Sequence, residues 1–196
     1  FERIGDAYTW GQGTRGALGH GDQQDQTVPL VMKDFLYLDV SFVACENSAS
    51  AALMLTGELF TWGSGEKGRL GHGDTADRVK PALVKELHGH KIMKVSMGAL
   101  HTLALDENGH IWAFGSSEHG QLGLGTDFIG PNAVQSTPRL IPALKSARVR
   151  DIACGHHHSA CITLEGVVMI WGRGEDGQLG MGNKDTFPSQ REVSWL

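Results

Sequence analysis

Short runs of apolar residues recur along this chain in the same order and at nearly constant intervals. Within many of them apolar and polar residues alternate, and a period of two is typical of a strand with one buried face. Aligned copies place Val43, Val95 and Ile152 in one position of a first strand. The pattern predicts first strands at 42–45, 94–97 and 151–154, second strands at 51–55, 103–105 and 160–164, third strands at 6–10, 58–62, 110–114 and 167–171, and fourth strands at 29–32, 81–84 and 138–141.

Turn signals separate the second and third predicted strands. The pairs at 56–57, 108–109 and 165–166 each end in glycine, which adopts the positive φ of a tight hairpin. The earlier fourth strands start with proline, which a sheet tolerates at its edge. The last set has Gln190 in that position, so we expect its final strand to be imperfect or frayed. Helix is expected to be scarce.

A glycine-rich string follows the third strand of every set. Its four copies begin at Trp10, Trp62, Phe114 and Trp171. Successive copies are 52, 52 and 57 residues apart. A fixed period of about 50 residues is the mark of an array in which each repeat is one supersecondary unit.

Four short antiparallel strands per repeat, with an aromatic residue and glycines at fixed places, predict an all-β fold of β-propeller blades. We expect the aromatic residues and motif leucines to pack between adjacent sheets, and the glycines to allow sharp turns and close approach of neighbouring backbones. The residues predicted to hold the blades together are Trp10, Gly11, Trp62, Gly63, Phe114, Gly115, Trp171, Gly172, Leu18, Leu70, Leu122 and Leu179.

Composition and charge narrow the class of protein without indicating a partner. Of the 196 residues, 40% are apolar and 20% are charged, as in an ordinary globular domain. The net charge of −5 gives no overall electrostatic attraction to nucleic acid, and no apolar run is long enough to span a membrane. Cys45, Cys154 and Cys161 are an odd number without framework spacing, which favours an intracellular protein, cytoplasmic or nuclear.

At the motif positions the chain resembles the regulator-of-chromosome-condensation (RCC1-type) repeat family. Residues 97–102 and 154–159 match the Cys/Met-Gly-x-x-His-Ser/Thr element of that family, and residues 45–50 depart from it. The resemblance implies an RCC1-like β-propeller of seven blades, in which residues 1–196 form a single segment of about three and three-quarter four-stranded blades. Half a ring leaves open sheet edges. We therefore expect the segment to be part of a longer chain, or a second copy to cover the edges.

The histidines at 156–158, between two cysteines, have the composition of a metal site, but the repeat favours a packing role. Cys154 occupies the position of Met97, and His158 that of His101. Successive strand residues also point to opposite faces. A metal-dependent hydrolase is therefore the disfavoured interpretation. No phosphate loop or Gly-x-Ser-x-Gly string occurs, and we predict no catalytic residue, cofactor or metal.

One repeat departs from the common length. Residues 127–136 contain the five-residue excess, and insertions in repeat proteins map to loops of one face, often the binding face. Phe128, Ile129 and Asn132 are the candidate protein-binding residues, because exposed apolar groups commonly mark contact sites. The alternative is that the loop packs back on its own blade.

These features predict a non-enzymatic scaffold that binds partner proteins through its loop faces. The resemblance implies one alternative, a guanine-nucleotide exchange factor for a Ran-type small GTPase, and a small GTPase or a chromatin protein as partner. The plant UV-B photoreceptor shares the propeller but relies on Gly-Trp-Arg-His-Thr strings. Residues 98–102 and 155–159 lack the Trp and the Arg, so photoreception is disfavoured.

Overall fold

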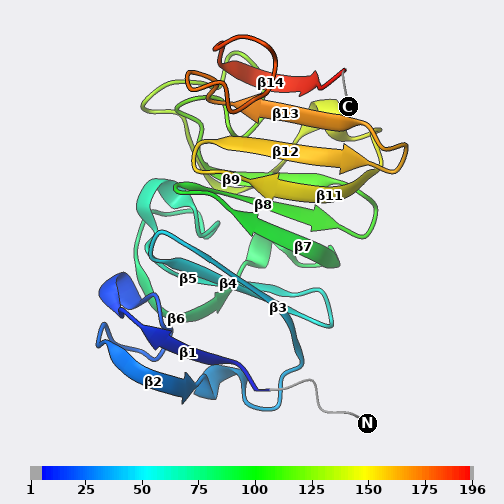
Figure 1. Ribbon diagram of the computed structural model, residues 1–196. Helices are drawn as coiled ribbons and strands as arrows, with labels where there is room; N and C mark the ends of the chain where they lie inside the picture. The colour runs from blue at the N-terminus through cyan, green and yellow to red at the C-terminus, as the bar shows by residue number, and fades with distance from the viewer. Residues whose placement is uncertain (1–5, 195–196) are drawn as a thin grey trace.

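The computed structural model describes residues 6–194, which form fourteen β-strands in four antiparallel sheets (Figure 1). One sheet has two strands, β1 (Tyr8–Gly11) and β2 (Gln26–Val31), and each of the others has four. The four-stranded sheets contain β3 (Val40–Glu46), β4 (Ala49–Met54), β5 (Leu59–Gly63) and β6 (Arg78–Leu83); β7 (Ile92–Met97), β8 (His101–Asp106), β9 (Ile111–Ser116) and β10 (Val134–Leu140); and β11 (Val149–Cys154), β12 (His158–Thr163), β13 (Val168–Gly172) and β14 (Phe187–Glu192). The predicted all-β blades are confirmed.

Within each sheet the strands are neighbours in chain order, so every blade is an up-and-down meander. The sheets are stacked in chain order, from β1–β2 at the bottom of Figure 1 to β11–β14 at the top. The first strands of successive blades contact one another, β3 with β7 and β7 with β11. The described residues thus form three complete blades, preceded by the third and fourth strands of another.

Helix within the described residues is confined to single turns of 3₁₀-helix, which confirms that helix is scarce. Two of these turns lie in the glycine-rich strings, and three connect a fourth strand to the next blade. They are η1 (Thr14–Gly16), η2 (Lys33–Phe35), η3 (Glu66–Gly68), η4 (Lys85–Leu87) and η5 (Pro142–Leu144).

The fourth strands begin earlier than predicted. Pro81 lies inside β6 rather than at its start, and the register with β5 shifts just before Gly63. The register of β14 with β13 shifts in the same way before Gly172, and β14 is six residues long, as is β6. The expectation of an imperfect final strand is therefore wrong. Pairing depends on the main chain, which Gln190 supplies as well as proline does at a sheet edge.

The motif aromatics are buried between sheets, with one exception. Trp62, Phe114 and Trp171 are 2%, 0% and 0% exposed. Trp10 is 59% exposed, because no described sheet precedes the one that carries it. The prediction that these rings pack between blades is confirmed for three of them and wrong for Trp10. The motif leucines are all buried, namely Leu18, Leu70, Leu122 and Leu179.

One carbonyl in each of the first three glycine-rich strings accepts hydrogen bonds from the next sheet. The carbonyl of Ala17 accepts from Ser50 Oγ and Trp62 Nε1, both at 2.9 Å. Two donors on one acceptor join the string to two adjacent strands of the next blade. The equivalent bonds run to Arg69 from Thr102 (2.9 Å), and to Gln121 from Ser159 and Trp171 (both 2.8 Å).

The seventh residue of each string is a glycine, and in the first three strings it faces the outermost strand of the next sheet. A Cβ on Gly68 would lie 2.6 Å from the Cα of Ser136 in β10, so a side chain there would clash with backbone. Gly177 has the same position in the last string, and no described atom lies within 4 Å of such a Cβ. The last sheet therefore has an open face where each earlier sheet meets its successor.

Candidate protein-binding surface

The insertion forms a bonded loop between β9 and β10, beside the third glycine-rich string. The amide of Ser117 donates to the carbonyl of Ala133 (2.8 Å), and the amide of Gly130 donates to the carbonyl of Ser117 (3.3 Å). The amide of Ala133 donates to the carbonyl of Gly130 (3.0 Å). These bonds hold the second half of the loop against the string.

The longer loop uses an anchor that the shorter loops also use. In the first string the amide of Gly13 donates to the carboxylate of Asp25 (2.8 Å), and in the second the amide of Gly65 donates to Asp77 (3.0 Å). Ser117 holds the same position in the third string. Its amide partner is a backbone carbonyl of the insertion, so the insertion replaces a side-chain acceptor with its own main chain.

The three candidate binding residues have different environments within this loop. Phe128 is half-buried and packs against the core cluster that contains Leu122 and Trp171. Ile129 is 41% exposed, and Asn132 is exposed. The loop therefore packs back on its blade through Phe128 while it presents Ile129 and Asn132 to solvent.

In the first two strings the sixth residue reaches toward the next repeat. Arg15 donates to Ser64 Oγ at 3.1 Å and lies 3.5 Å from the carboxylate of Asp77. Lys67 Nζ donates to the carbonyl of Pro131 at 2.9 Å, so the second string holds the outer part of the insertion. The Lys67 bond thus joins the insertion of one blade to the string of the blade before it.

Three imidazoles lie close together at the end of the sheets that carries the insertion loop. His156 and His157 belong to the turn between β11 and β12, and His119 belongs to the third string. His156 Nδ1 lies 2.9 Å from His157 Nε2, and the rings of His119 and His157 are 5.3 Å apart. Burial, followed by His156, His119 and Arg173, lowers the pKa of His157. No three His, Cys, Asp or Glu side chains in residues 6–194 are placed to hold a metal ion.

The cysteines beside these histidines have thiol pKa values that are raised by burial. Cys154 Sγ donates to the carbonyl of Ser96 at 3.3 Å, and burial raises the pKa of this thiol to about 12. Burial also raises the pKa of the Cys161 thiol to about 12. A thiol with such a pKa carries almost no thiolate at neutral pH, which is the nucleophilic form.

The glycine and histidine of the family element depend on each other. A Cβ on Gly98 would overlap the imidazole of His101, which is fully buried and has its Nε2 2.9 Å from Ser159 Oγ. Burial lowers the pKa of His101 to about 3, so the ring is neutral. The second sheet lacks the histidine and also lacks the glycine. The corresponding pairs are Gly98 and His101, Gly155 and His158, and Glu46 and Ala49.

The histidines inside the first two strings are structural. Thr61 Oγ1 donates to the carbonyl of Leu70 at 2.6 Å and lies 2.9 Å from His72 Nε2. Burial, followed by Arg78, lowers the pKa of His72 to about 4. Thr9 and His20 make the same pair at 2.9 Å. The later repeats hold apolar residues at both positions, Ala113 with Leu124 and Ile170 with Met181.

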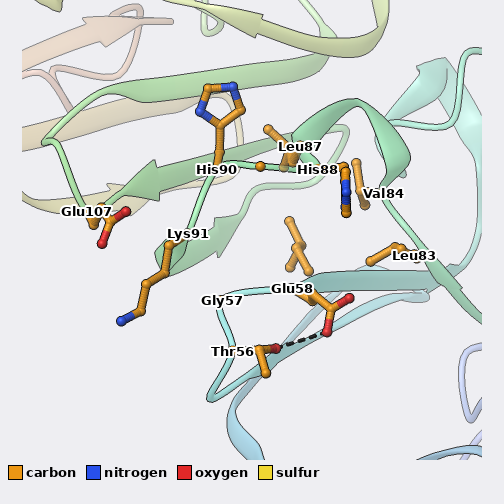
Figure 2. A pocket seen from close by; sticks show the side chains of 12 residues that line it. Thr56, Gly57, Glu58, Leu83, Val84, Leu87, His88, His90, Lys91 and Glu107 are labelled. Carbon is orange, nitrogen blue, oxygen red and sulfur yellow. Dashed lines mark hydrogen bonds between the residues drawn. The ribbon is translucent and has the colours of Figure 1, made fainter.

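A pocket of about 320 Å³ lies at the opposite end of the sheets, between the turn at 56–58 and the connector at 84–91 (Figure 2). Glu58, Lys91 and Glu107 supply its charges, and Thr56 Oγ1 donates to Glu58 at 2.9 Å. Its apolar lining consists of Leu59, Leu83, Val84 and Leu87. Sequence reasoning missed this pocket because its lining comes from three separate segments.

A buried carboxylate beside this pocket was also missed. Asp106 is 2% exposed and accepts hydrogen bonds from the amides of Asn108 (2.9 Å) and His110 (3.0 Å). It also accepts one from Trp112 Nε1 at 3.2 Å. The sequence held one sign of this burial: Asp106 occupies the repeat position that Met54 and Thr163 occupy in the neighbouring repeats. These bonds close the hairpin turn of the third blade.

The blade order, the buried motif aromatics and the string-to-sheet hydrogen bonds agree with one repeat family. The family described as RCC1-like domain matches residues 2–195. The chain belongs to this family. No helix in the described part of this RCC1-like chain is long and apolar enough to cross a membrane.

Relatives of this RCC1-like chain include two longer proteins. The human E3 ubiquitin-protein ligase HERC2 is 39% identical over 187 residues, which cover 92% of this chain and 4% of HERC2. The ultraviolet-B receptor UVR8 of Arabidopsis thaliana is 34% identical over 188 residues, which cover 95% of this chain and 42% of UVR8. The chain therefore spans less than half the length of either relative.

Solved structures confirm the propeller fold. Human WBSCR16 superposes with a TM-score of 0.83 at 25% identity, covering 97% of this chain and 49% of that one. Yeast RCC1 (Prp20), solved with Kap60, superposes with a TM-score of 0.83 at 22% identity, covering 96% and 44%. The RCC1-like chain thus matches less than half of each of these propellers.

Proposed function

We propose that this RCC1-like chain is a non-enzymatic scaffold that binds a protein partner through the insertion loop, which the insertion within residues 127–136 forms before β10. The observation that carries the proposal is a bonded loop, present in one repeat, that leaves Ile129 41% exposed. A loop already held in one conformation loses less entropy on binding. An exposed apolar side chain gains free energy when a partner covers it.

Each residue of the loop has its own part in this proposal. Ile129 enters an apolar depression on the partner, and Asn132 forms hydrogen bonds at its edge. Phe128 packs against the core and sets the direction of the loop, with Lys67 holding the carbonyl of Pro131. Burial of one isoleucine side chain is worth roughly 2 kcal/mol, enough to change affinity about thirtyfold.

The test is affinity capture with the 196-residue protein, followed by quantitative mass spectrometry. Ile129→Asp combined with Asn132→Ala is expected to lose proteins that the original chain retains. Leu164→Asp is the matched control, since Leu164 is 52% exposed in a turn at the opposite end of the sheets. Equal retention by the loop variant, with its fold confirmed by circular dichroism, would reject the loop as the binding surface.

Exchange of guanine nucleotide on a Ran-type GTPase is the alternative function. A solved structure of Prp20p from Saccharomyces cerevisiae was described together with its binding to Gsp1p and histones, but its 21% identity to this chain supports only the fold. Release of labelled GDP from a Ran-type GTPase tests the alternative directly. Acceleration that depends on the insertion loop would favour exchange over simple binding.

We also propose that residues 1–196 are one segment of a larger propeller. Two open faces support this proposal: Trp10 is 59% exposed, and nothing described approaches Gly177. In the interior of the array the equivalent tryptophans are buried, and the equivalent glycines touch the next sheet. Expression together with further repeats is expected to bury Trp10, seen as a blue shift of its fluorescence.

A further inference from the structure

The end of the sheets opposite the insertion loop carries an exposed apolar segment. Leu36, Tyr37 and Leu38 lie between η2 and β3 and are 36%, 85% and 44% exposed. Leu55, in the turn after β4, is 49% exposed, and its amide donates to the carbonyl of Asp39 at 2.9 Å. This bond brings the turn beside the segment. The three residues and Leu55 form one apolar patch, and such patches commonly mark contact sites.

Exposure at these positions is a property of the repeat and does not depend on the incomplete first sheet. The later connectors each join two complete sheets, and their residues at the positions of Leu36 and Tyr37 are exposed as well. The residues at the position of Leu55 are also exposed in both later blades. The equivalent residues are His88, Gly89 and Glu107 in one repeat and Lys145, Ser146 and Leu164 in the next. The first connector differs by having apolar side chains where the later connectors have polar residues or glycine.

Tyr37 has a strained backbone as well as an exposed ring. Its φ is +70°, in the left-handed region that bulky residues rarely adopt. Gly89 has the same position in the next repeat and adopts a φ of +87°, which costs glycine nothing. The connector is anchored by Phe35, which is 1% exposed and accepts a 3.0 Å hydrogen bond from the amide of Leu38. Residues held in strained conformations cluster at sites that contact ligands.

The pocket of Figure 2 adjoins this patch. The turn at 55–58 contributes Leu55 to the patch and Thr56 and Glu58 to the pocket. Glu58, Glu107 and Lys91 give the pocket lining one more negative than positive side chain. Figure 2 shows the Lys91 side chain extending away from Glu58. In the next repeat along the chain, His110 and Leu164 replace the two glutamates. The pocket therefore suits a cationic side chain in a way that the next interface does not.

We propose that the patch and the pocket together bind an extended segment of a partner protein, in which an arginine is flanked at alternate positions by apolar residues. Alternate residues of an extended segment point to the same side. The guanidinium pairs with the carboxylate of Glu58, which Thr56 Oγ1 holds in place. The methylene groups of the arginine lie along Leu83, while the apolar neighbours cover Leu38 and Leu55. This surface and the insertion loop lie at opposite ends, so both can be occupied at once.

The probe is the synthetic peptide acetyl-Leu-Ser-Arg-Ser-Leu-amide, whose symmetric order assumes no chain direction. Nuclear magnetic resonance of the isotope-labelled 196-residue protein is expected to show saturable shifts at the amides of residues 36–39, 55–58 and 87–91, with a Kd below about 1 mM. The matched peptide has citrulline in place of arginine, which keeps the shape and removes the charge. It should bind about fivefold more weakly. Added salt should weaken the binding of the arginine peptide alone.

Variants of the protein separate loss of contact from loss of fold. Glu58→Gln keeps the shape of the side chain and should weaken binding of the arginine peptide about fivefold. Glu165→Gln is the matched control, since Glu165 is exposed in a turn at the same end of the sheets and lies outside the pocket. Tyr37→Gly supplies the residue type of the next repeat. It should weaken binding without lowering the urea midpoint, because the backbone strain is released.

Three results would overturn the proposal. They are the absence of saturable shifts up to about 10 mM peptide, equal affinity for the arginine and citrulline peptides, and unchanged affinity of the Glu58→Gln protein. The variant with Ile129→Asp and Asn132→Ala should bind the arginine peptide as the original chain does. Failure of this second surface is therefore distinguishable from failure of the insertion loop in the capture experiment.

Discussion

The indole Nε1 of Trp171 donates a 2.8 Å hydrogen bond to the backbone carbonyl of Gln121, 50 residues earlier in the chain. The same carbonyl accepts from Ser159 Oγ, and it belongs to the preceding repeat. A side chain near the end of the third strand of one blade is thereby hydrogen-bonded to the glycine-rich string of the neighbouring blade. Phe114 has the same position in its blade but has no N–H to donate. It is nevertheless fully buried, so packing at this position does not require the hydrogen bond.

Trp171→Phe should cost about 1–2 kcal/mol of unfolding free energy, because a buried hydrogen bond and some apolar area are lost while Ser159 still satisfies the carbonyl. Urea denaturation measures the loss. Trp10→Phe is the matched control and should change stability by no more than about 0.5 kcal/mol, since Trp10 is exposed. Similar losses in both variants would contradict the assigned role of the bond.

Gly68→Ala should destabilise the protein more than Gly177→Ala. Both glycines have φ near that of a left-handed helix, +72° and +78°, so alanine costs about 1 kcal/mol at either position. Only at Gly68 does the new methyl group meet the Cα of Ser136, which adds about 1–3 kcal/mol of overpacking. The difference between the two urea midpoints checks this, and equal midpoints would show that the approach to Ser136 is unimportant.

Stability should fall as the pH is lowered from about 7 to about 4. The folded-state pKa values of His72 and His101 are lowered to about 4 and about 3, so the unfolded chain binds protons in this interval and the folded chain does not. Unfolding midpoints at a series of pH values measure the slope. Thr61→Ala with His72→Leu copies the apolar pair of the third repeat and should flatten that slope. An unchanged slope would mean that His72 titrates normally.

Lys67→Ala should loosen the insertion loop without unfolding the blades. The lysine ammonium donates to the carbonyl of Pro131, and an exposed bond of this kind contributes at most about 1 kcal/mol to stability. Hydrogen exchange at residues 126–133 is expected to become faster, with the amides of β8 unaffected. Lys85→Ala, an exposed lysine at the other end of the sheets, should leave the loop unchanged.

Much of the fold could be predicted because the alternating apolar and polar positions of each strand recur at equivalent places in every repeat. Val95 and Ile152 are buried at the positions where alternation placed them, and the motif leucines are buried as expected. What the repeat could not predict depends on neighbours. Trp10 has the same motif position as Trp62, yet it is exposed because its packing surface belongs to another sheet.

The candidate site could be located by sequence but not described. A change of interval from 52 to 57 residues pointed to the insertion. Its conformation depends on Lys67 and Ser117, which lie outside the inserted residues, so length alone could not place Phe128 inward and Ile129 outward. Asp106 was overlooked because a carboxylate at the end of a strand is ordinarily solvated.

Three four-stranded sheets with the same strand order offer a binding partner several nearly equivalent binding positions. Recognition through the common repeat alone would leave its rotation about the stacking axis undefined. The added residues after Gly125 remove this degeneracy, because one blade then differs at its rim from the other described blades. A partner that binds this rim would therefore have one defined rotation about the axis along which the sheets are stacked.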